Sequence, residues 1–169
     1  MGDGQLDRMA REVIDANVFL VLGTSEPDGT PRVSPVFYGV HRYRDFYWVS
    51  HPGSHHSANV AARPAVSWVV FDSSVTVRET RAVYCSGTAR EVPAGELAAH
   101  VGRAFREIRG ARAFTVDELT GDALRLYVAR AATCEVHVPG SHPTYGTGTD
   151  RRVAARPWPG HDGTPPGET

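Results

Sequence analysis

Apolar residues recur along this chain with two spacings, one typical of helices and the other of strands. Over residues 5–17 they recur every three or four positions, which predicts an amphipathic helix laid on a sheet. Six further segments are rich in β-branched and aromatic residues and are bounded by turn residues, which predicts strands. These strands are expected at residues 19–23, 32–40, 46–50, 65–71, 82–92 and 126–138.

Between and after these strands the sequence predicts three further helices and a polar connection. Helices are predicted at residues 54–62, 94–109 and 116–124. In the second of them Leu97, Val101, Phe105 and Ile108 share one face, and Gly110 is a stop signal. Residues 72–80 are expected to form a polar loop or an edge hairpin.

The order of these elements predicts a mainly β fold of the α+β class, a six-stranded antiparallel barrel with flanking helices. Most consecutive strands are joined by tight turns, such as the one at Pro27, Asp28 and Gly29, whereas parallel strands need a crossover helix between most pairs. Residues 1–138 are therefore expected to form one domain. Residues 139–169 are a Gly- and Pro-rich tail, expected to drape over a protein surface to about Pro159 and to be disordered beyond it.

Composition narrows the function classes. The 169 residues carry a net charge of −1, so there is no basic excess to attract nucleic acid or acidic membranes. No apolar run approaches the ~20 residues that span a bilayer, and the N-terminus does not resemble a secretory signal. Cys85 and Cys134 stand singly on predicted strands, which favours buried thiols in a reducing compartment. We expect a cytoplasmic protein whose partners are a small-molecule substrate and a second copy of itself.

The junction between the third strand and the next helix is a candidate anion site. A helix N-terminus presents unpaired N–H groups and the positive end of the helix dipole, which together favour a phosphate. The side chains available as donors at this junction are Ser50, Ser54, His55, His56 and Ser57.

The second strand offers a polar edge beside that junction. Strand alternation places Arg32 and Ser34 on one face and Val33 and Pro35 on the other. Because Pro35 lacks an N–H, one side of this strand cannot be fully paired, and its open edge could hydrogen-bond the rim of a planar heterocycle. Trp48 is available as an apolar or stacking surface.

The segments DGTPRVSPV, FYWVS and HHSAN, followed by RP and a buried strand, resemble the pyridoxamine 5′-phosphate oxidase-like flavin-binding split-barrel superfamily. The resemblance covers roughly residues 19–87. It implies a six-stranded Greek-key split barrel, a homodimer, and a flavin mononucleotide (FMN) or deazaflavin coenzyme at each of two sites between the subunits. The residues that it places at the cofactor are Arg32, Val33, Ser34, Pro35, Trp48, Val49, Ser50, Ser54, His55, His56 and Asn59.

The chain departs from the superfamily pattern at two places. His55 and His56 stand where the oxidase has an Arg-Lys phosphate clamp, so phosphate affinity is expected to be weaker and pH-dependent. The arginine and histidine motif that grips pyridoxal phosphate is not recognisable in residues 151–158, so oxidation of vitamin B6 is not expected. Deazaflavin-binding relatives favour several Arg or Lys at the same junction, which makes FMN the preferred cofactor.

Each candidate residue also has a structural interpretation. His55 and His56 can be solvated loop residues, Trp48 a core residue and Arg32 a solvated strand residue. A metal site is not expected, because Pro52 and Gly53 keep the neighbouring histidines off a common helix face and no acid or cysteine accompanies them. In the tail, His142 and Tyr145 are polar enough to meet a substrate but are also typical loop residues.

Two functions remain open. The first is an FMN-dependent oxidoreductase that acts on a small organic substrate. No catalytic side chain is predicted for it, because the flavin would supply the redox chemistry. The second is a non-catalytic module on the same barrel that holds a flavin, a deazaflavin, haem or pyridoxal phosphate.

Overall fold

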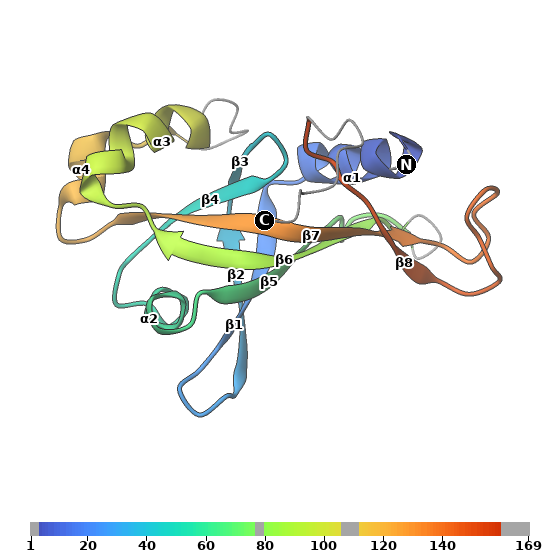
Figure 1. Cartoon of the computed structure of the whole chain (residues 1–169), viewed down its shortest axis with the longest axis horizontal. Coiled ribbons are helices and arrows are strands. Elements are labelled where there is room, and N and C mark those ends of the chain that lie inside the picture. The colour runs from blue at the N-terminus through green and yellow to red at the C-terminus, as the bar shows by residue number, and fades with distance from the viewer. Residues whose placement is uncertain (1–3, 77–79, 106–111, 160–169) are drawn as a thin grey trace, which may run out of the picture.

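The structure is a computed structural model that describes residues 4–76, 80–105 and 112–159 (Figure 1). An antiparallel sheet runs through the molecule, and helices flank it on more than one side. The helices are α1 (Gly4–Ala16), α2 (His55–Ala62), α3 (Leu97–Ala104) and α4 (Val116–Thr120), with a 3₁₀ turn, η2 (Ala94–Glu96), before α3. The strands are β1 (Phe19–Ser25), β2 (Pro31–Phe37), β3 (Gly39–His41), β4 (Asp45–Ser50), β5 (Ala65–Phe71), β6 (Ala82–Glu91), β7 (Arg125–Val138) and β8 (Arg151–Ala154).

The strand order is that of a Greek-key sheet. The order is β2-β1-β5-β6-β7-β4-β3, with β8 paired to β7. Within it, β5, β6 and β7 are consecutive neighbours, and the preceding strand β4 lies beside β7, which is the Greek-key arrangement. All strand pairs are antiparallel, as the tight turns predict.

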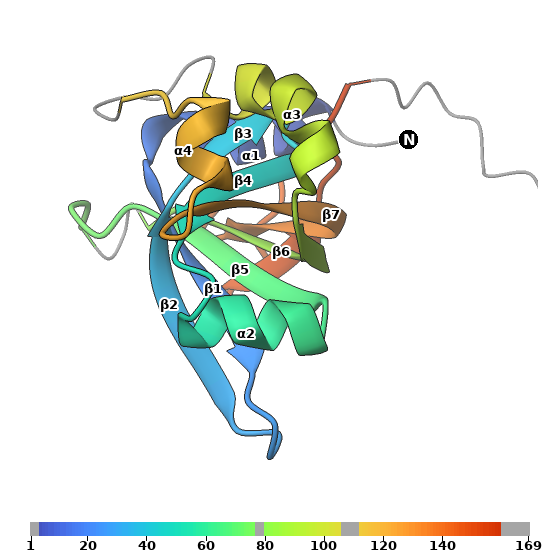
Figure 2. The same cartoon turned by 90° about the vertical axis from the view of Figure 1, so that its left-hand side faces the viewer.

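The sheet curls because its two ends are consecutive in the chain. β2 and β3 occupy opposite ends of the strand order but are separated only by Tyr38. Tyr38 is buried, its backbone N–H donates to the carbonyl of Val18, and its hydroxyl donates to the carbonyl of Ile14 at 2.6 Å. The chain therefore crosses from one end of the sheet to the other at Tyr38, giving a half-barrel with flanking helices (Figure 2).

The sequence predicts six strands, and the described residues form a sheet of eight. One of the additional strands arises because the predicted strand at 32–40 is divided at Tyr38 into β2 and β3. The other is β8, which lies in the tail and has no apolar alternation of its own. The count of six is therefore corrected, while the mainly antiparallel sheet with flanking helices agrees with a split barrel.

The two faces of the sheet carry different cores. The barrel interior is filled by a large cluster that includes Leu22, Trp48, Trp68 and Val70, and α1 adds Ile14 to it. The outer face of β4 and β7 carries a smaller cluster that packs under α3 and α4. Its buried members are Tyr47, Val92, Leu97, Ala104, Leu119, Leu126 and Val128.

The helices form close to where the sequence predicts them. Ser54 caps α2 by accepting a hydrogen bond from the backbone N–H of Ser57, and α4 begins with a capping box between Thr115 and Glu118. Of the helix predicted at 94–109, the structure describes the 3₁₀ turn and α3; residues 106–109, with Ile108, lie outside the described residues, as does Gly110. Within the described ranges, each helix is too short or too polar to cross a membrane.

The tail packs on its own domain as far as the structure describes it. β8 pairs with β7 from Glu135–Ala154 to Val138–Arg151. Beyond β8 the backbone N–H of Arg156 donates to Asp7, and Arg11 donates to the carbonyl of Pro157 at 2.6 Å, so the tail is fastened to α1. The described part of the tail thus packs on the same chain; the expected disorder after Pro159 falls outside the described residues.

Candidate functional site

The junction between β4 and α2 gathers a compact cluster of hydroxyl and imidazole groups. Nε2 of His56 lies 2.8 Å from Oγ of Ser50 and 3.2 Å from Oγ of Ser54. The two serine hydroxyls are 3.1 Å apart, and Oγ of Ser54 also donates to Oγ of Ser57 at 2.8 Å. We name Ser50, Ser54, His56 and Ser57 the α2 cluster. It forms because Ser54 caps the helix while Ser50 ends the strand that leads into it.

The α2 cluster carries little net charge. Burial lowers the pKa of His56, and the neighbouring His55 acts in the same direction, so the imidazole is neutral near pH 7. Glu26, from the β1–β2 turn, pairs with Arg32 and lies 3.3 Å from Nδ1 of His55. The hydrogen bond from Arg32 lowers the pKa of Glu26, which keeps that carboxylate ionised. The cluster can therefore donate hydrogen bonds to an anion, but the positive charge of Arg32 is already compensated.

β2 is an end strand of the sheet and presents an open edge. Among the described strands it pairs only with β1. Because the N–H of Tyr38 points to β1, strand alternation turns the backbone groups of Val33, Pro35 and Phe37 away from β1, towards the open edge. Pro35 adds a carbonyl and no N–H there. This edge can hydrogen-bond the polar rim of a flat ligand, as its sequence suggests.

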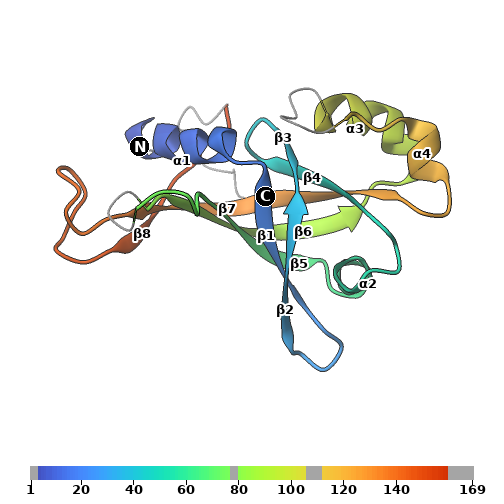
Figure 3. The same ribbon diagram turned by 180° about the vertical axis from the view of Figure 1, so that it is seen from behind.

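Two contacts tie α2 to the β1–β2 hairpin, which extends beyond the barrel (Figure 3). The side-chain amide of Asn59 donates to Oγ1 of Thr24 at 3.1 Å, and both residues are buried. At the end of α2, Arg63 donates to the carbonyl of Pro27 at 3.1 Å. Asn59 therefore serves to hold the helix in place beneath the hairpin.

The structure brings some of the predicted site residues together and separates others. Ser50, Ser54 and His56 meet in one cluster, and Arg32 and His55 meet at Glu26. Val33 is 71% exposed on the outer face of β2, whereas Ser34 faces the barrel side opposite Leu22. Val49 lies on the outer face of β4 and packs against the smaller core cluster.

Trp48 lies in the core, which agrees with the interpretation of this residue as a core residue. Its side chain is 1% exposed and stacks on Tyr127 with ring centroids 5.6 Å apart. Its indole Nε1 is buried and has no hydrogen-bond partner, as is that of Trp68. The Trp48 ring can therefore shape the site from behind but offers no free face for stacking.

Sequence reasoning missed Glu26 and Thr24 as parts of this site. Glu26 directly precedes the predicted turn at Pro27, Asp28 and Gly29, and in the structure it joins Arg32 to His55. Thr24 ends a strand and anchors Asn59. Both become visible only through the β1–β2 register, in which Thr24 lies opposite Arg32.

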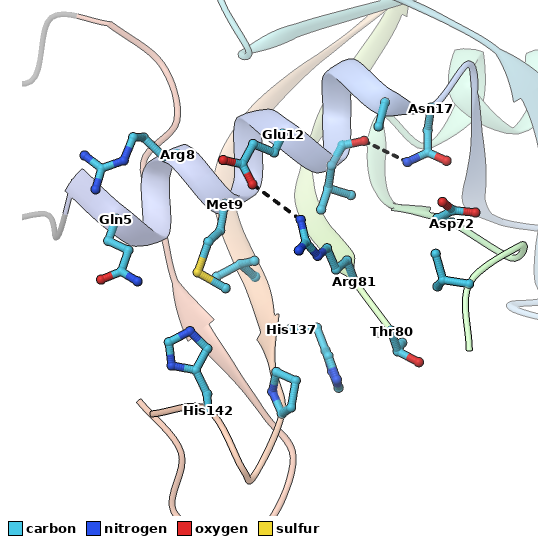
Figure 4. A pocket seen from close by; sticks show the side chains of 15 residues that line it. Gln5, Arg8, Met9, Glu12, Asn17, Asp72, Thr80, Arg81, His137 and His142 are labelled. Atoms are coloured by element: carbon cyan, nitrogen blue, oxygen red, sulfur yellow. Dashed lines mark hydrogen bonds and ion pairs between the residues drawn. The ribbon is translucent and has the colours of Figure 1, made fainter. Parts of the chain in front are cut away.

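A separate cavity of about 710 Å³ lies between α1, the β5–β6 connection and the start of the tail (Figure 4). None of the predicted cofactor residues lines it. Glu12 and Arg81 form an ion pair across it at 3.4 Å, and His142 projects into it beside Met9. Nδ1 of His142 accepts hydrogen bonds from the backbone N–H groups of Thr144 and Tyr145, so His142 also organises its own loop.

Within the described residues, no group of three or more His, Cys, Asp or Glu side chains could hold a metal ion. The two cysteines are buried and face each other across β6 and β7.

The family model described as "Pyridoxamine 5′-phosphate oxidase" matches residues 6–136. The chain belongs to the pyridoxamine 5′-phosphate oxidase family. The match extends from within α1 into β7, and so includes the α2 cluster and the open edge of β2. A comparison with curated proteins gave no significant match.

Solved structures show the same fold at low sequence identity. A haem-binding protein from Mycobacterium smegmatis has a TM-score of 0.65 and 18% identity, covering 88% of this chain and 57% of that one. A protein related to general stress protein 26 from Clostridium acetobutylicum, of the pyridoxinephosphate oxidase family, has a TM-score of 0.61 and 9% identity, covering 90% and 96%. An FAD-binding protein from Mesorhizobium loti has a TM-score of 0.56 and 21% identity, covering 75% and 87%. This pyridoxamine 5′-phosphate oxidase family member thus spans just over half the length of the haem-binding protein.

Proposed function

We propose that the protein is an FMN-dependent oxidoreductase that acts on a small organic substrate as a cytoplasmic homodimer. The observation that carries this proposal is the α2 cluster, in which Ser50, Ser54 and His56 converge at a helix N-terminus beside an open strand edge. A phosphate suits the first of these features and a planar heterocycle the second. FMN combines both groups in one molecule.

The residues of the chain have separate tasks in this proposal. Ser50, Ser54 and the first backbone N–H groups of α2 hydrogen-bond the phosphate, and neutral His56 adds one further donor or acceptor. The backbone edge of β2 from Arg32 to Pro35 orients the ring. When bound, the flavin supplies the transfer of hydride or electrons, and the protein supplies position and electrostatics.

An apolar area on the outer face of the sheet supports the homodimer. Phe19, Val33 and Phe71 are 56%, 71% and 43% exposed, respectively. The β1–β2 register places Phe19 opposite Phe37 and Gly23 opposite Val33, so Phe19 and Val33 share one face of the hairpin, and Phe71 ends β5, the other neighbour of β1. Large exposed apolar side chains that gather on one face are typical of a protein–protein interface. A second copy of the chain would cover it next to the open edge of β2.

A titration that compares FMN with riboflavin tests the phosphate part of the site. We expect the Ser54→Ala/His56→Gln double variant to bind FMN about tenfold more weakly, because two hydrogen bonds to a charged group are lost. Riboflavin lacks the phosphate, so its affinity should change little. His51→Gln is the matched control, since His51 is exposed in the same connection and its imidazole accepts a hydrogen bond from the backbone N–H of Gly53 rather than from a member of the α2 cluster. Equal losses for both ligands would contradict the assigned role of the α2 cluster.

A non-catalytic module that binds haem or a deazaflavin is the second candidate. It is favoured by the low charge of the cluster, where Glu26 compensates Arg32 and burial keeps His56 neutral. The absorbance spectrum of the freshly isolated protein, with mass spectrometry of the released molecule, distinguishes these cofactors from FMN. Turnover with reduced nicotinamide and a quinone or nitroaromatic acceptor then separates an enzyme from a carrier. A colourless protein that takes up none of the three cofactors would refute both candidates.

A further inference from the structure

A second cavity, of about 460 Å³, lies on the outer face of the sheet beside α3. Cross-strand register builds its floor: Arg130 of β7 lies opposite Thr88 of β6 on one side and Asp45 of β4 on the other. In a neighbouring row of the sheet, Arg90 lies opposite Val128. The helix α3 contributes His100 and Arg103. We name this the arginine cavity.

Guanidinium groups outnumber carboxylates around the arginine cavity. Among the described residues, three arginines line it, Arg90, Arg103 and Arg130, and two carboxylates lie near them, Asp45 in the lining and Glu96 beside it. Arg130 lies 3.5 Å from Asp45, and Arg90 lies 2.7 Å from Glu96 on η2. In the described part of the chain, Arg103 forms no ion pair with a carboxylate. The cavity therefore keeps a surplus of positive charge.

One wall of the cavity is an ordered polar network. Tyr47 is fully buried, and its hydroxyl lies 2.9 Å from Nδ1 of His100. The other ring nitrogen of His100 lies 3.5 Å from Glu96. Burial lowers the pKa of His100, and Arg90 and Arg103 lower it further. The carboxylates of Glu96 and Asp45 act in the opposite direction without cancelling these effects, so the imidazole is neutral near pH 7. Of these causes, the positive charges of Arg90 and Arg103 are the ones that also favour an anion nearby.

We propose that the arginine cavity binds a small dianionic ligand, such as a phosphate ester or a dicarboxylate, through Arg90, Arg103 and Arg130. A guanidinium group presents a planar fork of donors that matches two oxygens of a phosphate or carboxylate. The three forks come from β6, α3 and β7, so a single ligand is contacted from more than one side. None of these residues belongs to the α2 cluster or to β2, and the proposal does not depend on flavin binding.

Calorimetric titration of the full chain with sulfate tests the site, because sulfate stays dianionic across the working pH range. We expect saturable binding that weakens about tenfold in Arg103→Gln, which loses a charge-assisted contact. Asp45→Asn should act in the opposite direction and tighten binding severalfold, since it removes the carboxylate that competes for Arg130. A change that tightens binding cannot result from damage to the fold. Arg8→Gln is the control, since Arg8 lines the other cavity and should leave sulfate binding unchanged.

Glycerol phosphate and succinate, titrated in parallel, identify the class of dianion. Tighter binding of one of them than of sulfate, lost in Arg103→Gln, would support the proposal and assign the ligand class. The proposal is overturned if no dianion binds saturably, or if Arg103→Gln and Asp45→Asn both leave the affinity unchanged. Circular dichroism of each variant confirms that the fold is retained.

Discussion

The α2 cluster and the arginine cavity offer an anion different kinds of group, neutral hydrogen-bond donors in the first and charged guanidinium groups in the second. The α2 cluster uses serine hydroxyls, a neutral imidazole and a helix N-terminus, and Glu26 compensates its nearby arginine. The arginine cavity uses three guanidinium groups from three elements, with one carboxylate among its lining residues. The first is held together by hydrogen bonds within eight consecutive residues, Ser50 to Ser57, whereas the second depends on long-range strand pairing and on the packing of α3 beside the sheet.

This difference bears on selectivity. Donors in fixed positions recognise the shape of a ligand and lose little when salt is added, whereas exposed guanidinium groups attract many anions and are screened by salt. The α2 cluster is therefore suited to one defined cofactor, and the arginine cavity to a smaller ligand that exchanges.

A substitution at Gly87 should give the largest effect, because it disturbs the strands under the arginine cavity and leaves the α2 cluster intact. A Cβ atom at Gly87 would overlap the backbone carbonyl oxygen of Arg130, because the register of β6 and β7 shifts there. We expect Gly87→Ala to lower the free energy of unfolding by about 3 kcal/mol, since backbone must move to relieve the overlap. It should also abolish sulfate binding while FMN binding persists in the folded fraction. Chemical denaturation and the two titrations measure these effects.

Gly102 supplies the control for that substitution. It lies in α3 and has open space where a Cβ would be placed. Gly102→Ala should therefore stabilise the protein by about 0.5–1 kcal/mol, as expected for a helix interior. If Gly87→Ala were as well tolerated as Gly102→Ala, the close approach of β6 to β7 would be disproved.

Asn59 offers the corresponding, smaller change at the α2 cluster. Asn59→Ala removes the buried hydrogen bond to Thr24 and should cost about 1–2 kcal/mol of stability. FMN affinity should fall with it, because α2 is no longer fastened to the β1–β2 hairpin, while sulfate binding stays the same. In Asn59→Ala/Thr24→Val no polar partner is left unsatisfied, so part of the lost stability should return. Strict additivity of the two substitutions would contradict the pairing.

The smallest expected effect is the pH dependence due to two histidines, His56 in the α2 cluster and His100 at the arginine cavity. Burial lowers the pKa of both His56 and His100 below the ordinary value of 6.5, so the unfolded chain binds protons more readily than the folded one. Stability should be complete above that pH and decline as the pH falls through the lowered pKa values. We expect sulfate to raise the pKa of His100, and FMN to raise that of His56, in NMR titrations of the imidazole resonances. A sulfate-induced shift confined to His56 would locate the anion at the other region.

Much of the fold could be predicted from local pattern. The turn at Pro27, Asp28 and Gly29 and the start of the helix near Ser54 follow from residue types in short windows. The division of one predicted strand at Tyr38 could not be predicted, because it depends on where the two ends of the sheet meet. β8 was missed for a similar reason: Arg151–Ala154 has no strand pattern and is extended only because β7 offers it an edge.

Those parts of the candidate site that are close in the sequence could also be predicted. Ser50, Ser54 and His56 are close in the sequence, so a strand followed by a helix start is enough to bring them together. Trp48 shows the limit of this reasoning, since the face on which it lies is buried by the closure of the barrel. The arginine cavity could not be predicted from short stretches of the sequence, because its charged residues lie on three strands and one helix, β4, β6, β7 and α3, which meet only in the folded protein.

The fastening of the tail to α1 has a consequence for biosynthesis. α1 leaves the ribosome long before the residues that fasten it, because Arg156 lies 149 positions after Asp7 and Pro157 lies 146 positions after Arg11. During translation the nascent helix must therefore wait, with its apolar face covered by the growing sheet or by a chaperone, until residues 151–157 have been made and can pack on it.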